Sequence, residues 1–238
     1  MSKVIDLTDI IEMIDKESRT KEEYEILLDW AVQHDKVPEL YYMTAEVYRL
    51  CAENHMPAAY NNLGACYYTG KGVEQDYVKA AQYYELAADE GNIQAYNNLG
   101  YCYYYGRHQE ADYRKAFEYF SLGAAIGNHG NCYYKLGDMY RNGLHVECNY
   151  KLAFRLYCMA ANTDRASRMD YYPDIMYRIG KSWFEGMGTE KDLSRALEYL
   201  GVARSGYAHK EEDEFKYITG RIKEIDGMIQ EILQSDLK

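Results

Sequence analysis

A six-residue segment occurs twice in this chain, letter for letter, and its spacing constrains the fold more than any other feature. Residues 59–64 read Ala-Tyr-Asn-Asn-Leu-Gly, and residues 95–100 repeat them at an offset of 36 positions. Both copies continue into Cys-Tyr-Tyr and end at a glycine, Gly70 or Gly106. A fixed period of about 20 to 50 residues indicates a stack of small supersecondary units that share one continuous core.

Two weaker copies follow the first two. Each copy has a Leu-Gly or Ile-Gly pair, then a glycine six positions later, then an alanine ten positions beyond it. The pairs are Leu63-Gly64, Leu99-Gly100, Leu136-Gly137 and Ile179-Gly180, and the alanines are Ala80, Ala116, Ala153 and Ala196. Only the return segment varies in length, and its longest form predicts an insertion over residues 162–174.

Each repeat has the apolar pattern of two helices. Tyr60, Leu63 and Tyr67 follow one another at steps of three and four, and Ala80, Tyr84 and Ala87 at steps of four and three, so each set marks one helical face. A glycine inside a helix costs about 1 kcal/mol relative to alanine. The Gly of the Leu-Gly pair therefore predicts a neighbouring helix that leaves no room for a Cβ atom.

The segment between the two helices carries cap residues. Glycines 70, 106, 143 and 186 are expected to end the first helices, and Asp76, Asp112, Asn149 and Asp192 to cap the second ones. This register makes those polar residues caps rather than catalytic groups.

Both ends of the chain carry further helices. Thr20 and Glu23 form a capping box that opens a helix through about residue 34, Pro38 is expected to open the next, and a helix over residues 8–17 precedes both. Near the C-terminus, isoleucines recur at steps of three and four from Ile218 to Ile232. This seam predicts a capping helix, with a homodimer seam as the alternative.

The composition is that of an ordinary globular chain. Hydrophobic residues make up 47% and the formal net charge is −11, which disfavours nucleic acid and anionic membranes as partners. The early acidic residues exclude the basic start of a signal peptide, and no long apolar run follows, so a cytoplasmic location is expected. Six cysteines at unequal repeat positions predict free thiols.

The first repeat also carries a family motif. Residues 70–80 read Gly-Lys-Gly-Val-Glu-Gln-Asp-Tyr-Val-Lys-Ala, and residues 87–92 read Ala-Ala-Asp-Glu-Gly-Asn. The string strongly resembles the Sel1-like repeat, a relative of the tetratricopeptide repeat. The resemblance covers about two thirds of the chain and is loosest over 175–208, where the insertion and Gly201 depart from it. Secreted, cysteine-rich members linked to β-lactam binding have a Cys pair in each repeat, which this chain lacks.

The resemblance implies an all-α fold, a right-handed α-α superhelix (solenoid) of Sel1-like, tetratricopeptide-like helical hairpins with capping helices. We expect one continuous domain, with an N-terminal capping helix over 1–20, a degenerate hairpin over 21–55, four repeats over 56–208 and a C-terminal capping helix over 209–238. The family consists mainly of non-enzymatic adaptors and scaffolds. A protein or peptide is therefore the expected partner, and a structural module that oligomerises through the C-terminal helix is the alternative.

By analogy with tetratricopeptide units, first-helix positions line a concave binding face. The predicted binding residues are Asn61, Tyr68, Asn97, Tyr101, Tyr104, Tyr134, Asp138, Arg141, Tyr177 and Lys181. Tyrosine and asparagine are typical of adaptable recognition surfaces. A solvated groove is the alternative interpretation, and a grip on a terminal carboxylate by Asn61, Asn97, Arg141 and Lys181 is a third.

The insertion is a further candidate contact. It contributes Arg165, Arg168, Tyr171 and Tyr172, and a longer loop at a repeat junction often marks a binding edge. A tolerated surface insertion explains the same residues equally well.

No residue pattern indicates chemistry. His129-x-x-Cys132 and His145-x-x-Cys148 have zinc-type ligands, but the helix between them holds the pairs about 15 Å apart. Cys66 and Cys102 lie one turn from core leucines and are expected to be buried and inert. We therefore predict no metal, no cofactor and no enzymatic activity.

Overall fold

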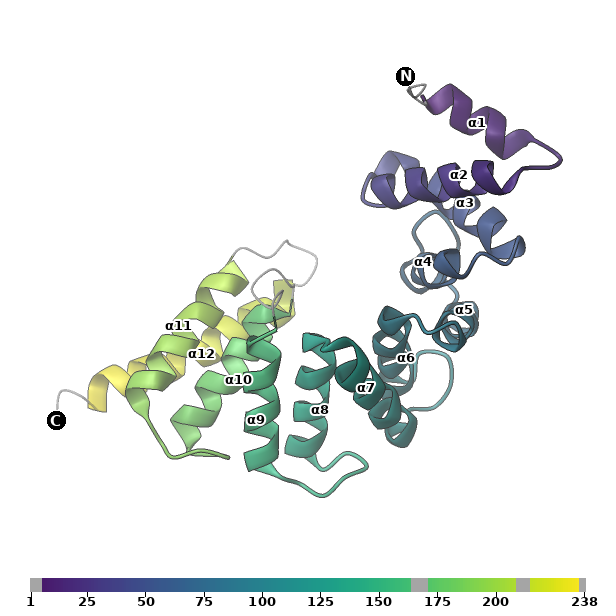
Figure 1. The fold of residues 1–238 in the computed structure, drawn as a ribbon. Helices are drawn as coiled ribbons and strands as arrows, with labels where there is room; N and C mark the ends of the chain where they lie inside the picture. Colours follow the sequence, from purple (N-terminus) through teal and green to yellow (C-terminus); the bar gives the residue numbers. More distant parts are fainter. Residues whose placement is uncertain (1–5, 164–170, 209–214, 236–238) are drawn as a thin grey trace. The chain divides into compact units, whose positions relative to one another are not determined.

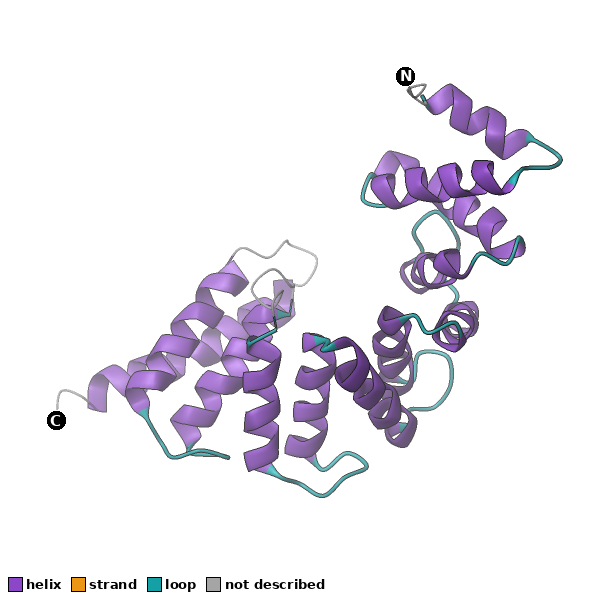
Figure 2. Cartoon of the chain, viewed as in Figure 1, coloured by secondary structure: helices purple, strands orange, loops and turns teal. Residues whose placement is uncertain are grey.

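Helices make up all of the regular structure in the residues that the structure describes. The computed structural model describes residues 6–163, 171–208 and 215–235 (Figures 1 and 2). The elements are α1 (Leu7–Asp15), α2 (Lys21–His34), the 3₁₀ turn η1 (Pro38–Leu40), α3 (Tyr41–Glu53), α4 (Pro57–Thr69), α5 (Tyr77–Asp89), α6 (Ile93–Tyr105), α7 (Tyr113–Gly127), α8 (Gly130–Asn142), α9 (Tyr150–Ala161), α10 (Tyr172–Glu185), α11 (Leu193–Ala208) and α12 (Phe215–Ser235). The predicted all-α class is confirmed.

The contacts divide the chain into two compact units. Unit 1 is Met1–Asp112 and contains α1 to α6, and unit 2 is Tyr113–Lys238 and contains α7 to α12. Within each unit, every helix packs on the one before it, and the most extensive contacts join α4 to α5, α8 to α9 and α10 to α11. These pairs are the two helices of the first, third and fourth repeats, so each of these three repeats is a helical hairpin. The prediction of one continuous domain stays a prediction.

The four C-cap glycines and three of the four N-caps predicted from the repeat register are present, and the cap role of Asp112 stays a prediction. Gly70, Gly106, Gly143 and Gly186 end their helices with φ between +61° and +73°, a left-handed conformation that glycine adopts without steric cost. At the start of the second helices, Asp76 accepts from the backbone N–H of Lys79 at 3.0 Å, Asn149 from Leu152 at 2.9 Å and Asp192 from Arg195 at 2.9 Å. These side chains are therefore occupied in capping.

The glycine of the Leu-Gly pair marks close helix contact, as predicted. A Cβ atom on Gly64 would lie 2.7 Å from Cδ1 of Tyr84, and one on Gly137 would lie 2.5 Å from Cε1 of Tyr157. Both tyrosines are buried, so their rings have little room to move aside. The missing Cβ lets the two helices of a repeat approach each other over a large aromatic side chain.

Two helix starts differ from the predictions. Thr20 and Glu23 form the expected capping box of α2, but Pro38 opens the 3₁₀ turn η1, and the α-helix begins only at Tyr41. In the insertion, α9 ends at Ala161 and α10 begins at Tyr172. The end of the predicted insertion therefore belongs to a helix, with Pro173 in its first turn, where proline is well tolerated.

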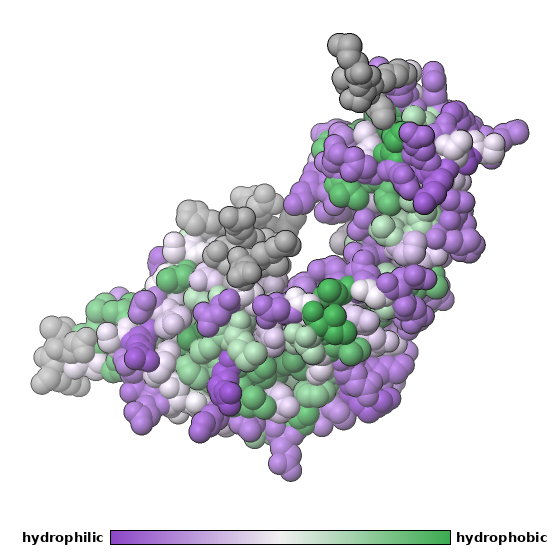
Figure 3. Space-filling model, viewed as in Figure 1, coloured by the Kyte–Doolittle hydropathy of each residue, from purple (hydrophilic) through white to green (hydrophobic). Residues whose placement is uncertain are grey.

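Tyrosine fills much of each core. Tyr48 in unit 1 and Tyr157, Tyr177 and Tyr207 in unit 2 are among the largest fully buried side chains. Hydrophobic residues also reach the surface over the middle helices of unit 2 (Figure 3). Several large apolar side chains on second helices are exposed, among them Leu122 at 41%, Met159 at 46% and Val202 at 43%.

Candidate functional site

The ten predicted binding positions lie on first helices of the repeats. Five belong to α4 and α6 of unit 1, and five to α8 and α10 of unit 2. We call these two sets the predicted faces of unit 1 and of unit 2.

A carboxamide ladder joins α4 to α6 on the predicted face of unit 1. Asn98 donates its side-chain N–H to Oδ1 of Asn61 at 3.0 Å, and Asn97 lies 3.5 Å from Asn98. Asn97 is only 4% exposed, so a partner cannot contact it in this conformation. Asn98, which the sequence analysis passed over, is the residue that reaches Asn61.

Tyrosines cluster at the C-terminal end of the same face. Tyr105 stacks on Tyr101 with ring centroids 5.7 Å apart, and it meets Tyr104 edge-on at 4.9 Å. Tyr68 meets Tyr77 edge-on at 5.2 Å. Tyr105 is 48% exposed, so the cluster offers ring faces to solvent. Such rings bury large area at a low entropic cost on binding.

Two cations lie on tyrosine rings one repeat apart. Lys71 Nζ lies 5.0 Å above the ring of Tyr41, and the guanidinium of Arg107 lies 5.4 Å above the ring of Tyr77. The two pairs are related by the 36-residue offset of the repeat. In the described part of the chain neither cation makes an ion pair with a carboxylate. Sequence reasoning missed both, although comparing the residues after the C-cap glycines would have found them.

A small cavity lies beside Lys71. It has a volume of about 130 Å³ and is lined by Asp35, Tyr41, Thr44, Tyr48, Asn62, Ala65, Cys66, Thr69 and Lys71. Tyr48 is 2% exposed and its hydroxyl has no hydrogen-bond partner. Burial raises the pKa of Tyr48, and the nearby charge of Asp35 adds to the shift. The hydroxyl therefore remains a neutral donor.

The repeat register explains the cavity. Ala65 and Thr69 are small, whereas the next repeat has Tyr101 and Tyr105 at the same positions, and those two rings stack on each other. The first repeat therefore leaves space where the second one has aromatic side chains.

In unit 2, Asp138 is part of the core. It is 4% exposed and accepts from Arg178 Nε at 2.8 Å and from the Tyr157 hydroxyl at 2.9 Å. It thereby ties α8 to α9 and α10. Tyr134 and Tyr177 are also buried, at 6% and 1%. These three predicted residues cannot contact a partner in this conformation, because the helical face they lie on is covered.

The C-terminal helix supplies contacts to this face. Glu224 of α12 accepts from the Tyr177 hydroxyl at 2.5 Å and from Lys181 Nζ at 2.7 Å. Arg221 of α12 lies 4.0 Å above the Tyr177 ring. Of the remaining predicted positions, Arg141 pairs with Glu185 at 3.3 Å. The predicted face of unit 2 is therefore already in contact with a polypeptide segment.

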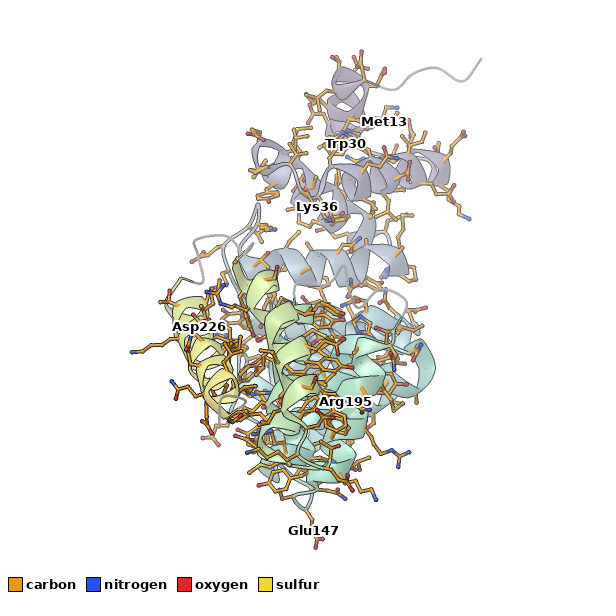
Figure 4. The ribbon with its side chains drawn as sticks, turned by 90° about the vertical axis from the view of Figure 1, so that its left-hand side faces the viewer. Met13, Trp30, Lys36, Glu147, Arg195 and Asp226 are labelled. Carbon is orange, nitrogen blue, oxygen red and sulfur yellow. The ribbon has the colours of Figure 1, made fainter. Side chains whose placement is uncertain are left out.

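The isoleucine seam of α12 packs within the chain. Ile218, Ile225 and Ile232 are buried in the core cluster of unit 2, and α12 lies beside α11, where Arg204 pairs with Asp226 at 2.5 Å (Figures 1 and 4). In this conformation these isoleucines are not available as a homodimer seam.

The residues of the insertion divide into two groups. Arg165 and Arg168 lie outside the described residues. Tyr171 stacks on Tyr134 with centroids 6.4 Å apart, and Tyr172 is the first residue of α10; both pack against the core of unit 2.

The described residues show little that resembles a catalytic centre. Burial raises the pKa of Cys66 to about 11 and that of Cys102 to about 12, which leaves both as neutral thiols. No group of three or more His, Cys, Asp or Glu side chains in the described ranges is placed to share a metal ion. Nor does any helix there combine the length and the apolarity that spanning a membrane requires.

Stacked helical hairpins with repeated caps define a helical-repeat protein, and the sequence comparison gives its family. The Sel1 repeat model matches residues 57–92, 93–128, 130–162 and 173–203, more than half of the chain. The chain belongs to the Sel1 repeat family. No curated protein matches the sequence.

Solved structures show the same fold. A Sel1 repeat protein from Oxalobacter formigenes is similar with a TM-score of 0.67 at 18% identity, over 85% of this chain and 87% of that one. A protective antigen from uropathogenic Escherichia coli strains that displays an SLR fold is similar with a TM-score of 0.58 at 16% identity, over 95% of this chain and 64% of that one.

Proposed function

We propose that this protein is a non-enzymatic adaptor or scaffold that holds a peptide or protein partner on first-helix faces of its repeats. Sel1 repeats are generally modules for protein-protein interaction. The proposal places the partner-contacting surface of unit 1 on its tyrosine cluster, on the carboxamides of Asn61 and Asn98, and on Lys71 and Arg107.

The observation that carries the proposal is the repeated cation-tyrosine arrangement. Holding a cation over a ring partly desolvates it and fixes its position, and an arginine or lysine so held is an effective donor to a carboxylate or carbonyl. Unit 1 has a marked excess of acidic residues, with 20 Asp and Glu against nine Lys and Arg over positions 1–112. Two cations without ion pairs in such surroundings support a recognition role, because a structural role would pair them with one of the abundant carboxylates.

Affinity capture from lysate of the source organism tests this function. The variant Lys71→Ala/Arg107→Ala removes both cations, and Lys21→Ala/Arg155→Ala removes a lysine and an arginine from exposed positions elsewhere. We expect a protein that binds wild type and the control variant and is lost from the Lys71→Ala/Arg107→Ala variant. Equal capture by all three proteins would count against the proposed surface of unit 1.

The alternative of an oligomerising module that uses the C-terminal helix has less support, because the apolar seam of α12 is buried within unit 2. A mass in solution that rises with concentration would favour it. The cytoplasmic location stays a prediction.

A further inference from the structure

One carboxylate of α12 meets the predicted face of unit 2. Glu224 accepts hydrogen bonds from Tyr177 at 2.5 Å, from Lys181 at 2.7 Å and from Arg221 at 3.0 Å. Two of these donors lie on α10, at positions that the repeat register assigns to partner binding, and Arg221 lies on α12 itself. Ile225 and Ile232 of the same helix are buried in the core of unit 2, at 0% and 1% exposure, and the helix on which α12 packs most extensively is α11. Thus α12 packs on the last repeat and reaches the predicted face on α10 through Glu224 and Arg221.

The helix that makes this contact contains two interior glycines that packing does not explain. A Cβ on Gly220 or on Gly227 would meet nothing within 4 Å, and both residues are exposed. Each glycine makes the helix about fivefold less favourable than an alanine would. Gly137 differs, since a Cβ there would lie 2.5 Å from Tyr157. Thus α12 is weakened at two places without any gain in close packing.

We propose that α12 is a built-in ligand of unit 2, and that a partner helix of the same chemistry replaces it there. The partner would be an amphipathic helix with isoleucine-like side chains three to four residues apart and a carboxylate at the position of Glu224. This inference rests on the proposed function, because it names the kind of partner that the predicted face of unit 2 takes.

Because α12 is tethered to unit 2, it competes with any added helix for the same face. Because α12 belongs to the same chain, a helix added in trans binds only the fraction of molecules whose α12 has left the face, and its apparent affinity falls by that fraction. A change that loosens α12 without altering α10 therefore strengthens the binding of the added helix. A change that stabilises the α12 helix weakens the binding of the added helix.

The probe is a fluorescently labelled peptide of residues 215–235, titrated into the full-length protein and followed by anisotropy. Glu224→Lys in the protein places a lysine against Lys181 and Arg221, so α12 is repelled while α10 is unchanged. We expect the peptide to bind this variant at least tenfold more tightly than wild type. Glu231→Lys makes the same charge change at an exposed position of α12 and is expected to match wild type. A peptide carrying Glu224→Lys is expected not to bind.

Hydrogen exchange gives an independent readout, which decides the question if Glu224→Lys does not fold. In wild type, the amides of α12 are expected to exchange faster than those of α10 and α11, because α12 opens locally. Gly220→Ala/Gly227→Ala is expected to slow the exchange of the α12 amides about 25-fold and to leave the exchange of the α10 amides unchanged. The inference is overturned if a folded Glu224→Lys protein binds the peptide no more tightly than Glu231→Lys does. It is equally overturned if α10, α11 and α12 exchange together in both proteins.

None of these readouts involves Lys71, Arg107 or a natural partner. A negative result with the α12 peptide therefore says nothing against the proposed surface of unit 1. A negative result in the affinity capture likewise says nothing against the proposal for α12.

Discussion

The hydroxyl of Tyr177 donates a hydrogen bond to the carboxylate of Glu224 over 2.5 Å, although the two residues are 47 positions apart in the sequence. The bond joins α10 to α12. Tyr177 lies at a position where the repeat register predicts contact with a partner, and Glu224 lies in the helix that follows the last repeat. The chain thus uses a predicted binding position for one of its own helices. The same surface chemistry that serves recognition in a repeat protein serves here to hold a terminal helix in place.

Gly137→Ala is expected to destabilise the protein by about 1–3 kcal/mol. The added Cβ would lie 2.5 Å from the Tyr157 ring, which is fully buried and held by its hydrogen bond to Asp138. Gly201→Ala is the control, because a Cβ there meets nothing within 4 Å inside α11, and it is expected to stabilise by up to about 1 kcal/mol. Urea denaturation measures both, and a neutral Gly137→Ala would contradict the close helix pairing.

Asp138→Ala is expected to cost about 3–5 kcal/mol, because it leaves the guanidinium of Arg178 mostly buried without its carboxylate. The side chains of this pair are 5% and 20% exposed. Asp138→Ala/Arg178→Met removes both charges and is expected to recover a large part of the loss. Arg114→Ala breaks a pair whose side chains are 57% and 54% exposed, so we expect little change there. Equal losses of stability in Asp138→Ala and Arg114→Ala would show that the buried ion pair contributes no more to folding than an exposed one.

The contribution of Glu224 to stability is expected to disappear in acid. Although burial raises the pKa of Glu224, the hydrogen bonds from Lys181 and Tyr177 outweigh burial and hold it below its ordinary value of 4.5. A carboxylate with a lowered pKa in the folded state stabilises at pH values above its unfolded pKa, and that stability is lost as the pH falls through the folded pKa. Glu224→Gln should therefore be less stable than wild type at neutral pH, and the difference should shrink as the pH falls below 4.5. A difference that is constant with pH would contradict the contact.

Thiol reactivity is expected to separate the six cysteines. Burial raises the pKa of Cys132 and of Cys102 to about 12, so neither forms an appreciable thiolate at pH 8. Cys148 is exposed and is expected to react first with Ellman's reagent. Cys148→Ser should remove the fast phase, and the buried thiols should react only on unfolding. A fast phase that persists in Cys148→Ser would place a reactive thiol elsewhere.

The repeated part of the chain was predictable because one pattern constrains several elements at once. The spacing from Leu63 through Gly70 to Ala80 places a helix, its C-cap and the next helix, and the structure has all three. The Thr20 capping box was readable for the same local reason. Pro38 misled the prediction because a proline is equally favourable in the first turn of a 3₁₀ helix.

The site was less predictable, because it depends on contacts outside the period. Nothing in the repeat register places Glu224 against Tyr177, since α12 belongs to no repeat. Burial of Asn97 depends on the neighbouring helices, and in an α-helix the adjacent Asn98 points about 100° away from it, so a one-position choice decides which residue reaches Asn61. Lys71 and Arg107 could have been predicted from the sequence, because the 36-residue offset relates the pair Lys71 and Tyr41 to the pair Arg107 and Tyr77.

The central claim is that a partner protein lies against the first-helix face of unit 1, and site-specific photo-crosslinking in cells of the source organism tests it most directly. A photo-crosslinking phenylalanine analogue is placed either at Tyr68, which is half-buried in the tyrosine cluster, or at Ile11, which is 43% exposed on α1, a helix that carries none of the proposed surface. Our account predicts a crosslinked partner from position 68 and none from position 11. The same crosslinks from both positions, or crosslinks from position 11 alone, would contradict it.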